Sequence, residues 1–381
     1  MKNIVILGSN GSVGRQTISV ALENKNINIL GISVSFNFED NIKIIDICNP
    51  RYVCLRNNKL LSKYKEKFPN IIFKYGKKNL SFLTSLKYEN NQVHIVNALP
   101  GIFGIESSIN TIKNDNILLL ANKETFVVAG ALINSLLSKH KTSYIIPLDS
   151  EHSSLYRLLG NANFKPSTYS ITASGGALRD YTSIDKESVT FSDIMRHPTW
   201  VMGPKITLDS TTLLNKGFEV IEAHHLFNID FENIDVYFQR ESMVHSFITN
   251  DKNESLYYIS YPSMEEPIRY ALNYPTTKFD TSCIFNSNSK HILTKMDITK
   301  YELVQLSYYV GKKGGLLPCV LVASSEATYS LFKDNIIKYN QISEIIIQIV
   351  KKYDNIIDSV NIKNINLLSK KIINEIIRKY T

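Results

Sequence analysis

Short apolar runs alternate with helix-like stretches through the first part of the chain. Residues 3–7 (Asn-Ile-Val-Ile-Leu) form the first run, and similar runs occupy 27–34, 52–55, 94–96, 117–120 and 144–146. Stretches with helical spacing lie between them, among them 42–47 and 129–138. Continuously apolar strands are typical of a sheet covered on both faces. The alternation therefore predicts an α/β fold with a parallel, doubly wound sheet.

The pattern changes after about residue 150. Turn-rich segments with strands at 236–239 and 256–260 predict an α+β region, with one helix over about 210–227. Residues 276–300 show no regular spacing, which predicts an irregular linker. From 301 onwards apolar residues recur three and four positions apart, as in Ile342, Ile345 and Ile349. This spacing predicts the apolar faces of a C-terminal helical bundle.

Composition narrows the classes of function. The 381 residues are 44% hydrophobic and 20% charged, which excludes a disordered or fibrous chain. The net charge of +8 comes without a dense Lys/Arg block, so a small anionic substrate fits better than nucleic acid. The four cysteines form no Cys-x-x-Cys pair, and no apolar run approaches the ~18 residues of a membrane helix. With no signal or transit pattern at the start, we expect a bacterial-type cytoplasmic protein without a membrane partner.

A glycine-rich turn follows the first predicted strand. It reads Gly8-Ser9-Asn10-Gly11-Ser12-Val13-Gly14 and opens the first helix. Small residues there let the backbone approach a pyrophosphate at a helix N-terminus, so the turn indicates dinucleotide binding. A tight strand-to-helix turn without a ligand is the alternative. The second strand ends in Ser33-Val34-Ser35-Phe36-Asn37, which has neither an acid nor a base and leaves the choice between NAD and NADP open.

Two further motifs end apolar strands. Leu120-Ala121-Asn122-Lys123-Glu124 places a lysine at the carboxyl edge of the sheet, where open α/β folds bind ligands. Pro147-Leu148-Asp149-Ser150-Glu151-His152 places two carboxylates on one side of an extended segment. Oxygen ligands of this kind favour Mg²⁺ or Mn²⁺ over zinc. Surface turns are the alternative in both cases, and we interpret His152 as a structural hydrogen-bonding residue outside the site.

The densest polar segments follow. Thr172-Ala173-Ser174-Gly175-Gly176 could cradle a phosphate or be a flexible turn. The segment from His197 to Glu222 carries the only Trp of the chain, Trp200, in a loop flanked by Pro and Gly. This suggests a lid, and a Trp buried by its own loop is the alternative. On the predicted helix, Asn215, Glu219 and Glu222 share one face. Glu219 would complete a three-carboxylate cation site, and Ser210, Asn215 and Lys216 could hold a phosphate.

These motifs, in this order, resemble those of the 1-deoxy-D-xylulose 5-phosphate reductoisomerase family. The resemblance covers the whole chain, is strongest over 1–225, and is carried most specifically by HPTWVMGPKITLDSTTLLNKGFEVIEAHHLF. It implies an NADPH-dependent oxidoreductase that rearranges and reduces a phosphorylated sugar, the committed step of non-mevalonate isoprenoid synthesis. The implied cofactors are NADPH and Mg²⁺ or Mn²⁺, with Co²⁺ as a further option. A retro-aldol/aldol path and an α-ketol shift both remain open.

The resemblance assigns roles to matching positions. It implies metal ligands at Asp149, Glu151 and Glu219, and a lid that includes Trp200 and Met202. The implied contacts to substrate oxygens and phosphate are Lys123, Ser150, Glu151, Ser174, His197, Ser210, Asn215, Lys216 and Glu219. The implied NADPH contacts are Asn10, Gly11, Ser12, Val13, Ser35, Asn37, Asn122, Glu124 and Gly203. The resemblance implies that Glu222 lies next to the metal ligands and supports them rather than binding the metal itself.

The implied architecture has a Rossmann-like NADPH-binding domain over 1–149, a catalytic and dimerisation domain over 150–275, a linker over 276–300 and a helical bundle over 301–381, in a homodimer. Three departures stand out. Asn10 replaces the usual Thr, Phe36 replaces a basic residue before Asn37, and Gln239-Arg240-Glu241-Ser242 replaces His-Pro-Gln-Ser. Two other functions remain open: another metal-assisted NADP-linked dehydrogenase, and a non-catalytic descendant of the family.

Overall fold

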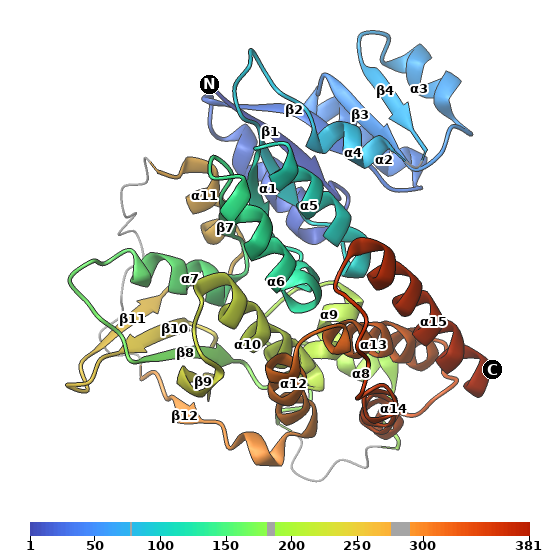
Figure 1. Ribbon diagram of the computed structural model, residues 1–381. Coiled ribbons are helices and arrows are strands. Elements are labelled where there is room, and N and C mark those ends of the chain that lie inside the picture. The colour runs from blue at the N-terminus through green and yellow to red at the C-terminus, as the bar shows by residue number, and fades with distance from the viewer. Residues whose placement is uncertain (77, 181–186, 276–289) are drawn as a thin grey trace. The chain divides into compact units, whose positions relative to one another are not determined.

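The computed structural model describes residues 1–76, 78–180, 187–275 and 290–381 (Figure 1). It divides into two compact units. The first unit comprises the described residues within Met1–Asn122, Ile133–Ser153 and Met264–Phe279. The second unit comprises those within Lys123–Leu132, Ser154–Ser263 and Asp280–Thr381. The finer four-part division stays a prediction.

A seven-stranded parallel sheet forms the centre of the first unit, in the order β4-β3-β2-β1-β5-β6-β7. The strands are β1 Lys2–Leu7, β2 Ile27–Ser33, β3 Tyr52–Leu55, β4 Ile72–Tyr75, β5 His94–Asn97, β6 Ile117–Leu120 and β7 Ile145–Pro147. The elements between and after them are α1 Ser12–Leu22, α2 Phe38–Cys48, α3 Leu61–Lys67, α4 Asn79–Thr84, η1 Gly101–Gly104, α5 Ile105–Lys113, α6 Glu124–Lys139 and α7 Ser150–Leu159. The predicted doubly wound sheet is confirmed.

Alternate residues of β1 enter two separate cores, one on each face of the sheet. Ile4 and Ile6 pack into the larger core, and Val5 and Leu7 into the smaller one. All four are fully buried, which explains why the strand reads as one continuous apolar run. Helices α1 and α2 contribute to the larger core, and α4 contributes Leu83 to the smaller one.

Helix α11 (Glu265–Asn273) belongs to the first unit although it lies far along the chain. Its buried Ile268 and Leu272 join the larger core, where it packs against α1. Lys2 Nζ donates hydrogen bonds of 2.7 Å to the carbonyl oxygens of Leu272 and Tyr274. The sequence pattern alone does not predict this return of the chain.

The second unit holds a five-stranded sheet in the order β11-β10-β8-β9-β12. Its strands are β8 Thr168–Ala173, β9 Ile234–Phe238, β10 Val244–Thr249, β11 Ser255–Ile259 and β12 Thr294–Lys295. Strands β8 and β9 are parallel, and the other pairs are antiparallel. The same unit contains α8 Phe191–Ile194, α9 Pro204–Thr211, α10 Leu214–Phe227, η2 Phe231–Asn233 and η3 Ile298–Lys300.

Four helices after residue 301 form the predicted bundle (Figure 1). They are α12 Glu302–Lys313, α13 Leu317–Lys333, α14 Tyr339–Lys352 and α15 Ile362–Tyr380. Helix α13 packs against α12, α14 and α15 and is buried over most of its length. This position explains why residues 317–323 of the helix are apolar on all sides.

Two sequence predictions need correction. The single helix expected over 210–227 is two helices, because Leu213 adopts φ 61°, a left-handed conformation that ends α9 before α10 begins. The linker expected over 276–300 falls partly outside the described residues, and its described part holds β12 and η3. The apolar pattern also missed β4, β8 and β10.

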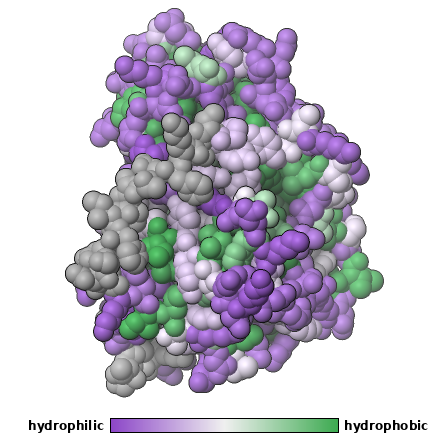
Figure 2. All heavy atoms as spheres, turned by 90° about the vertical axis from the view of Figure 1, so that its left-hand side faces the viewer, coloured by the Kyte–Doolittle hydropathy of each residue, from purple (hydrophilic) through white to green (hydrophobic). Residues whose placement is uncertain are grey.

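Hydrophilic residues predominate over the described part of the face in Figure 2, with hydrophobic residues interspersed among them. The largest exposed hydrophobic side chains come from separate loops and helices, among them Phe36, Phe103, Val201 and Ile357. Within the described ranges, every helix is too short or too polar to cross a membrane.

Candidate active site

The glycine turn of the first unit is shaped by contacts that only glycine permits. Gly8 has φ +84°, and a Cβ on Gly14 would lie 2.3 Å from the Gly8 carbonyl oxygen. Helix α1 therefore begins tightly against the end of β1, with Gly11 as its N-cap and no acidic residue in its first turn. Its free N–H groups and positive dipole end suit an anionic group. Ser12 is exposed there, and Val13 packs against the larger core.

Asn10 connects this turn to the segment after β2. Its Oδ1 accepts a hydrogen bond of 2.8 Å from the Ser35 N–H, and its Nδ2 donates to Asp40 (2.6 Å) and Asn41 (2.9 Å). Asp40 also accepts from Arg15, and that guanidinium lowers the pKa of Asp40. The predicted cofactor residue Asn37 caps α2, with its Oδ1 accepting from the Asp40 N–H at 3.0 Å. The two loops predicted to hold the cofactor are thus hydrogen-bonded to each other.

Asn122 follows β6 and is buried. Its Nδ2 donates hydrogen bonds of 2.9 Å to the carbonyl oxygens of Leu99 and Gly101. These bonds join the carboxyl ends of β5 and β6. The predicted cofactor residue Asn122 therefore holds the adjoining loop in shape.

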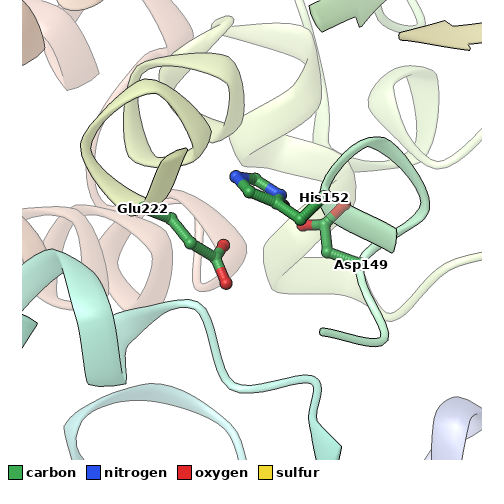
Figure 3. A group of neighbouring side chains, drawn as sticks. All are labelled: Asp149, His152 and Glu222. Carbon is green, nitrogen blue, oxygen red and sulfur yellow. Dashed lines mark ion pairs between the residues drawn. The ribbon is translucent and has the colours of Figure 1, made fainter. Parts of the chain in front are cut away.

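Asp149 and His152 lie at the start of α7 in the first unit, and Figure 3 draws them with Glu222 of α10. His152 Nδ1 is 3.6 Å from Asp149 Oδ2, and all three of these residues are buried. Ser150 Oγ donates to Glu151 Oε2. One expectation was wrong here, because Glu151 stands in a helical first turn rather than in an extended segment. His152 lies beside Asp149 because both occupy the same face one turn apart.

Glu219 is the centre of a charged network in the second unit. It comes from α10 and is only 1% exposed. Lys123 Nζ, at the start of α6, lies 3.3 Å from its Oε1, and Asn215 Nδ2 donates to the same oxygen at 2.6 Å. Lys216 Nζ pairs with Oε2. The expected shared face of Asn215 and Glu219 is confirmed, and two ammonium groups compensate the buried carboxylate.

His197 brings Ser174 and Ser210 together. Ser174 follows β8 and Ser210 lies in α9, and their hydroxyls are 3.1 Å and 3.4 Å from His197 Nε2. His197 Nδ1 accepts a hydrogen bond of 2.9 Å from the Trp200 N–H, so the neutral ring carries its proton on Nε2. Burial, together with the positive charge of Arg179, lowers the pKa of His197 to about 4. These groups form a cluster of hydrogen-bond donors suited to an anion.

The predicted lid residues lie in an irregular segment before α9. Trp200 is partly buried, and its ring stands edge-on to that of His245 with 6.1 Å between centroids. Met202 is partly buried and Val201 is 95% exposed. Gly203 is the N-cap of α9, and a Cβ there would meet no atom within 4 Å. The Trp200 backbone is therefore anchored to His197, while Val201 and Gly203 are exposed.

Glu124, the first residue of α6, was predicted to contact the cofactor. Burial raises the pKa of its carboxyl to about 7, and the charges of Glu326 and Asp209 act in the same direction. Lys205 opposes this shift, but it also pairs with Asp209 and donates to Ser325 Oγ at 2.8 Å. The sequence pattern did not single out Lys205 and Asp209, which lie within the long motif four positions apart on α9.

The segment Gln239–Ser242 forms a turn that is held by hydrogen bonds of its own side chains. The side chain of buried Gln239 accepts a hydrogen bond of 2.7 Å from the Met243 N–H and donates to Glu241 at 2.5 Å. Ser242 adopts φ 55° and its hydroxyl lies 3.3 Å from that of Thr199. Gln239 thus stabilises this turn, whose sequence differs from the His-Pro-Gln-Ser of the family. Ser242 contacts the lid segment through Thr199.

Comparisons with known proteins agree with these features. The profile of 1-deoxy-D-xylulose 5-phosphate reductoisomerase matches residues 4–130, and two profiles of C-terminal domains of the same enzyme match 145–227 and 259–372. The reductoisomerase of Clostridium tetani is 37% identical over 362 residues, which cover 93% of each chain. That of Clostridium perfringens (strain 13 / Type A) is 35% identical over 389 residues and covers both chains completely.

Solved structures give the same result. A crystal structure of DOX-P reductoisomerase in complex with NADPH, fosmidomycin and magnesium has a TM-score of 0.91 and 25% identity, covering 100% of this chain and 98% of that one. The Zymomonas mobilis reductoisomerase in complex with NADPH shares the fold, with a TM-score of 0.87 at 23% identity, covering 100% of this chain and 99% of that one. From its profiles, its relatives and its fold, the chain belongs to the 1-deoxy-D-xylulose 5-phosphate reductoisomerase family.

Proposed function

We propose that the chain isomerises 1-deoxy-D-xylulose 5-phosphate and reduces the product with NADPH to 2-C-methyl-D-erythritol 4-phosphate. This reaction is the committed step of isoprenoid synthesis by the non-mevalonate route and depends on a divalent cation. Beyond family membership, one observation carries the proposal. Ser174, His197 and Ser210 come from three separate segments of the second unit and converge at the His197 ring.

The glycine turn fits NADPH. The space around Gly14 and Gly8 admits no Cβ, and the first turn of α1 has no acid that would repel a pyrophosphate. Asn10 keeps this turn bonded to Ser35, so the pyrophosphate and ribose segments keep their relative position. We assign Gly11, Ser12 and Val13 to the pyrophosphate side of the cofactor. Ser35, Asn37, Asn122, Glu124 and Gly203 are assigned to its remaining contacts.

The donor set of Asp149, Glu151 and Glu219 fits Mg²⁺ or Mn²⁺, because all three offer carboxylate oxygens. A cation held by these carboxylates would supply a Lewis acid for the substrate's oxygens. Lys123 and Lys216 neutralise Glu219 in the second unit. We infer that these ammonium groups also bind the substrate, Lys123 at an oxygen of the sugar and Lys216 at the phosphate, and that Ser150 is a further contact to a substrate oxygen.

The cluster around His197 suits the substrate's phosphate. Its Nε2–H and the hydroxyls of Ser174 and Ser210 are hydrogen-bond donors, and Asn215 and Lys216 follow on α10. The neutral state of His197 keeps its Nδ1 as acceptor for the Trp200 N–H. We infer that Trp200 and Met202 cover the bound sugar phosphate and exclude water from the reacting carbons.

The experiment that tests this function measures NADPH oxidation by the purified chain with deoxyxylulose phosphate. We expect oxidation with Mg²⁺ or Mn²⁺, its loss on chelation, and its return when the cation is restored. Deoxyxylulose without phosphate should give little or no rate. Oxidation that ignores the phosphate would indicate a different metal-assisted dehydrogenase. A chain that binds NADPH yet turns over no substrate with any cation would indicate a non-catalytic role.

We also propose a homodimer in the cytoplasm, as the family resemblance implies. The three described cysteines, Cys48, Cys54 and Cys319, are buried and free, which suits a reducing compartment. Light scattering coupled to size-exclusion chromatography tests the assembly. A mass near that of one 43.3 kDa chain across the concentration range would refute the dimer.

A further inference from the structure

The segment after β2 lacks a base where a 2′-phosphate would be recognised. Phe36 stands there and is 68% exposed. Its neighbours Ser35 and Asn37 are uncharged. Charge selection for NADPH therefore requires a cation from another element.

Strand β3 brings such a cation to the same place. In the parallel register Ser33 of β2 lies opposite Cys54 of β3, and the Val34 N–H donates to the Cys54 carbonyl oxygen at 3.0 Å. The carboxyl ends of the two strands are thus adjacent. Arg56 is the first residue after β3, just as Phe36 follows the end of β2.

The guanidinium of Arg56 stacks on two exposed aromatic rings. It lies 5.0 Å from the centroid of Phe36 and 4.9 Å from that of Phe103. Phe103 belongs to η1, after β5, and is 51% exposed. In the sheet order β3-β2-β1-β5, these three residues come from loops on both sides of the glycine turn after β1. Both rings lie within cation–π distance of the guanidinium carbon and restrict where the Arg56 side chain can lie.

Arg56 also keeps its charge available. Within the described ranges its side chain makes no ion pair or hydrogen bond, and it lies over the two rings. The nearby cation of the glycine turn, Arg15, is already paired with Asp40 at 2.5 Å. Arg56, which follows β3 beside the end of β2, is thus an exposed cation with no ion-pair partner among the described residues. A planar guanidinium suits a phosphate dianion.

We propose that Arg56, positioned by Phe36 and Phe103, binds the 2′-phosphate of NADPH and gives this chain its preference for NADPH over NADH. The inference rests on the proposed function, because it assigns a subsite of the same cofactor. Phe36 stands where a basic residue is missing, and its ring positions the guanidinium of Arg56 instead.

Equilibrium binding tests the assignment without turnover. We would measure Kd values for NADPH and NADH by cofactor fluorescence, and for 2′,5′-ADP and 5′-AMP by calorimetry. Arg56→Gln should raise the Kd for NADPH and 2′,5′-ADP about tenfold or more, since a hydrogen bond to a charged group is lost. The Kd for NADH and 5′-AMP should change less than about twofold, because these ligands lack the 2′-phosphate.

A matched control comes from the same strand. Arg51 precedes β3 at its amino end and also stacks on a ring, that of Tyr52 at 5.4 Å. Arg51→Gln should leave all four Kd values unchanged. Phe36→Lys in the Arg56→Gln background should restore NADPH preference, since it returns a cation to the end of β2.

The outcomes separate the two proposals. A wild-type chain that binds neither NADPH nor NADH would refute the proposed function itself. If wild type binds NADPH but shows no preference over NADH, or if Arg56→Gln leaves the preference intact, the Arg56 assignment is wrong. An equal loss for both nucleotides would also overturn it, because a merely structural role predicts that pattern.

Discussion

Lys123 Nζ lies 3.3 Å from Glu219 Oε1, although the two residues are 96 positions apart in the chain. Lys216 pairs with the other carboxylate oxygen. A carboxylate that is 1% exposed is tolerated because these two ammonium groups offset its charge. The same three groups are those that we assign to the cation and to the substrate, so the network prearranges the charges of the site before either binds.

The first prediction concerns Glu219→Gln. It keeps the size and shape of the side chain, but it removes the charge and replaces one of the two acceptor oxygens by an N–H donor. We expect turnover to fall by at least about a hundredfold, more than is lost when only a partner of a metal ligand is changed. The Mg²⁺ concentration needed for half-maximal rate should rise. Steady-state kinetics over a Mg²⁺ titration measures both.

Glu232→Gln is the matched control for this variant. Glu232 is exposed and pairs with Lys312 at 2.5 Å in the same unit. It should retain wild-type kinetics. Circular dichroism must show that the Glu219 variant is folded, and near-normal turnover in that folded variant would contradict the cation assignment.

The second prediction uses Trp200 as the single tryptophan reporter of the lid segment. Protonation of His197 puts a hydrogen on Nδ1 and removes the acceptor of the Trp200 N–H. The pKa of His197 is lowered to about 4 by burial and Arg179. Tryptophan emission should therefore change as pH falls through about 4, and not near 6.5.

The same shift affects stability, because the unfolded chain binds this proton near pH 6.5 and the folded chain near 4. The contribution of His197 to the free energy of unfolding is fully present above pH 6.5 and is lost as the pH falls towards 4. His197→Gln should abolish the emission step, whereas His140→Gln, at a histidine paired with Asp115 in the first unit, should preserve it. A wild-type step at pH 6.5 would count against a buried neutral His197.

The third prediction concerns the packing of α10 on α12. A Cβ on Gly217 would lie 2.1 Å from Ser307 Oγ and 2.6 Å from its Cβ. Gly217→Ala should lower the free energy of unfolding by about 1–3 kcal/mol, because the helices must separate. Urea unfolding measures the change. Gly203→Ala, whose added methyl group meets no atom within 4 Å, should cost less, since it loses only the preference of an N-cap for glycine over alanine.

The fourth prediction concerns Asn10, which stands where the resembled pattern has Thr. Asn10→Ala removes the bond from the Ser35 N–H and two bonds to α2. NADPH affinity should fall about tenfold, because the hydrogen bonds that hold the two loops together are lost, with kcat little affected. Asn10→Thr should be intermediate, since a hydroxyl can replace one bond.

Asn28→Ala is the control for Asn10. Asn28 makes a comparable side-chain bond, 2.7 Å to Asn3, at the opposite end of β2. Fluorescence titration with NADPH distinguishes the variants. Equal affinity in the Asn10→Ala chain and wild type would show that the connection between the two loops is unnecessary for binding.

The local sequence pattern was enough to predict the alternation of strands and helices in the first unit. It also placed Asn215 and Glu219 on one face of α10. Buried parallel strands are apolar on both faces, so β1 was visible as a run of adjacent apolar residues. Asn215 and Glu219 could be placed together because one helical turn separates them. The prediction of one continuous helix over 210–227 was wrong, because the left-handed conformation of Leu213 does not change the spacing of apolar residues.

Only the tertiary structure decided which distant residues meet. The convergence of Ser174, Ser210 and His197, the return of α11 to the first sheet, and the stacking of Arg56 on Phe36 each depend on which strands pair and in what register. The edge strand β4 was missed because its partial exposure breaks the apolar pattern. Periodicity records a residue's near neighbours along the chain, whereas these contacts arise only when hydrophobic burial has fixed the packing of whole elements.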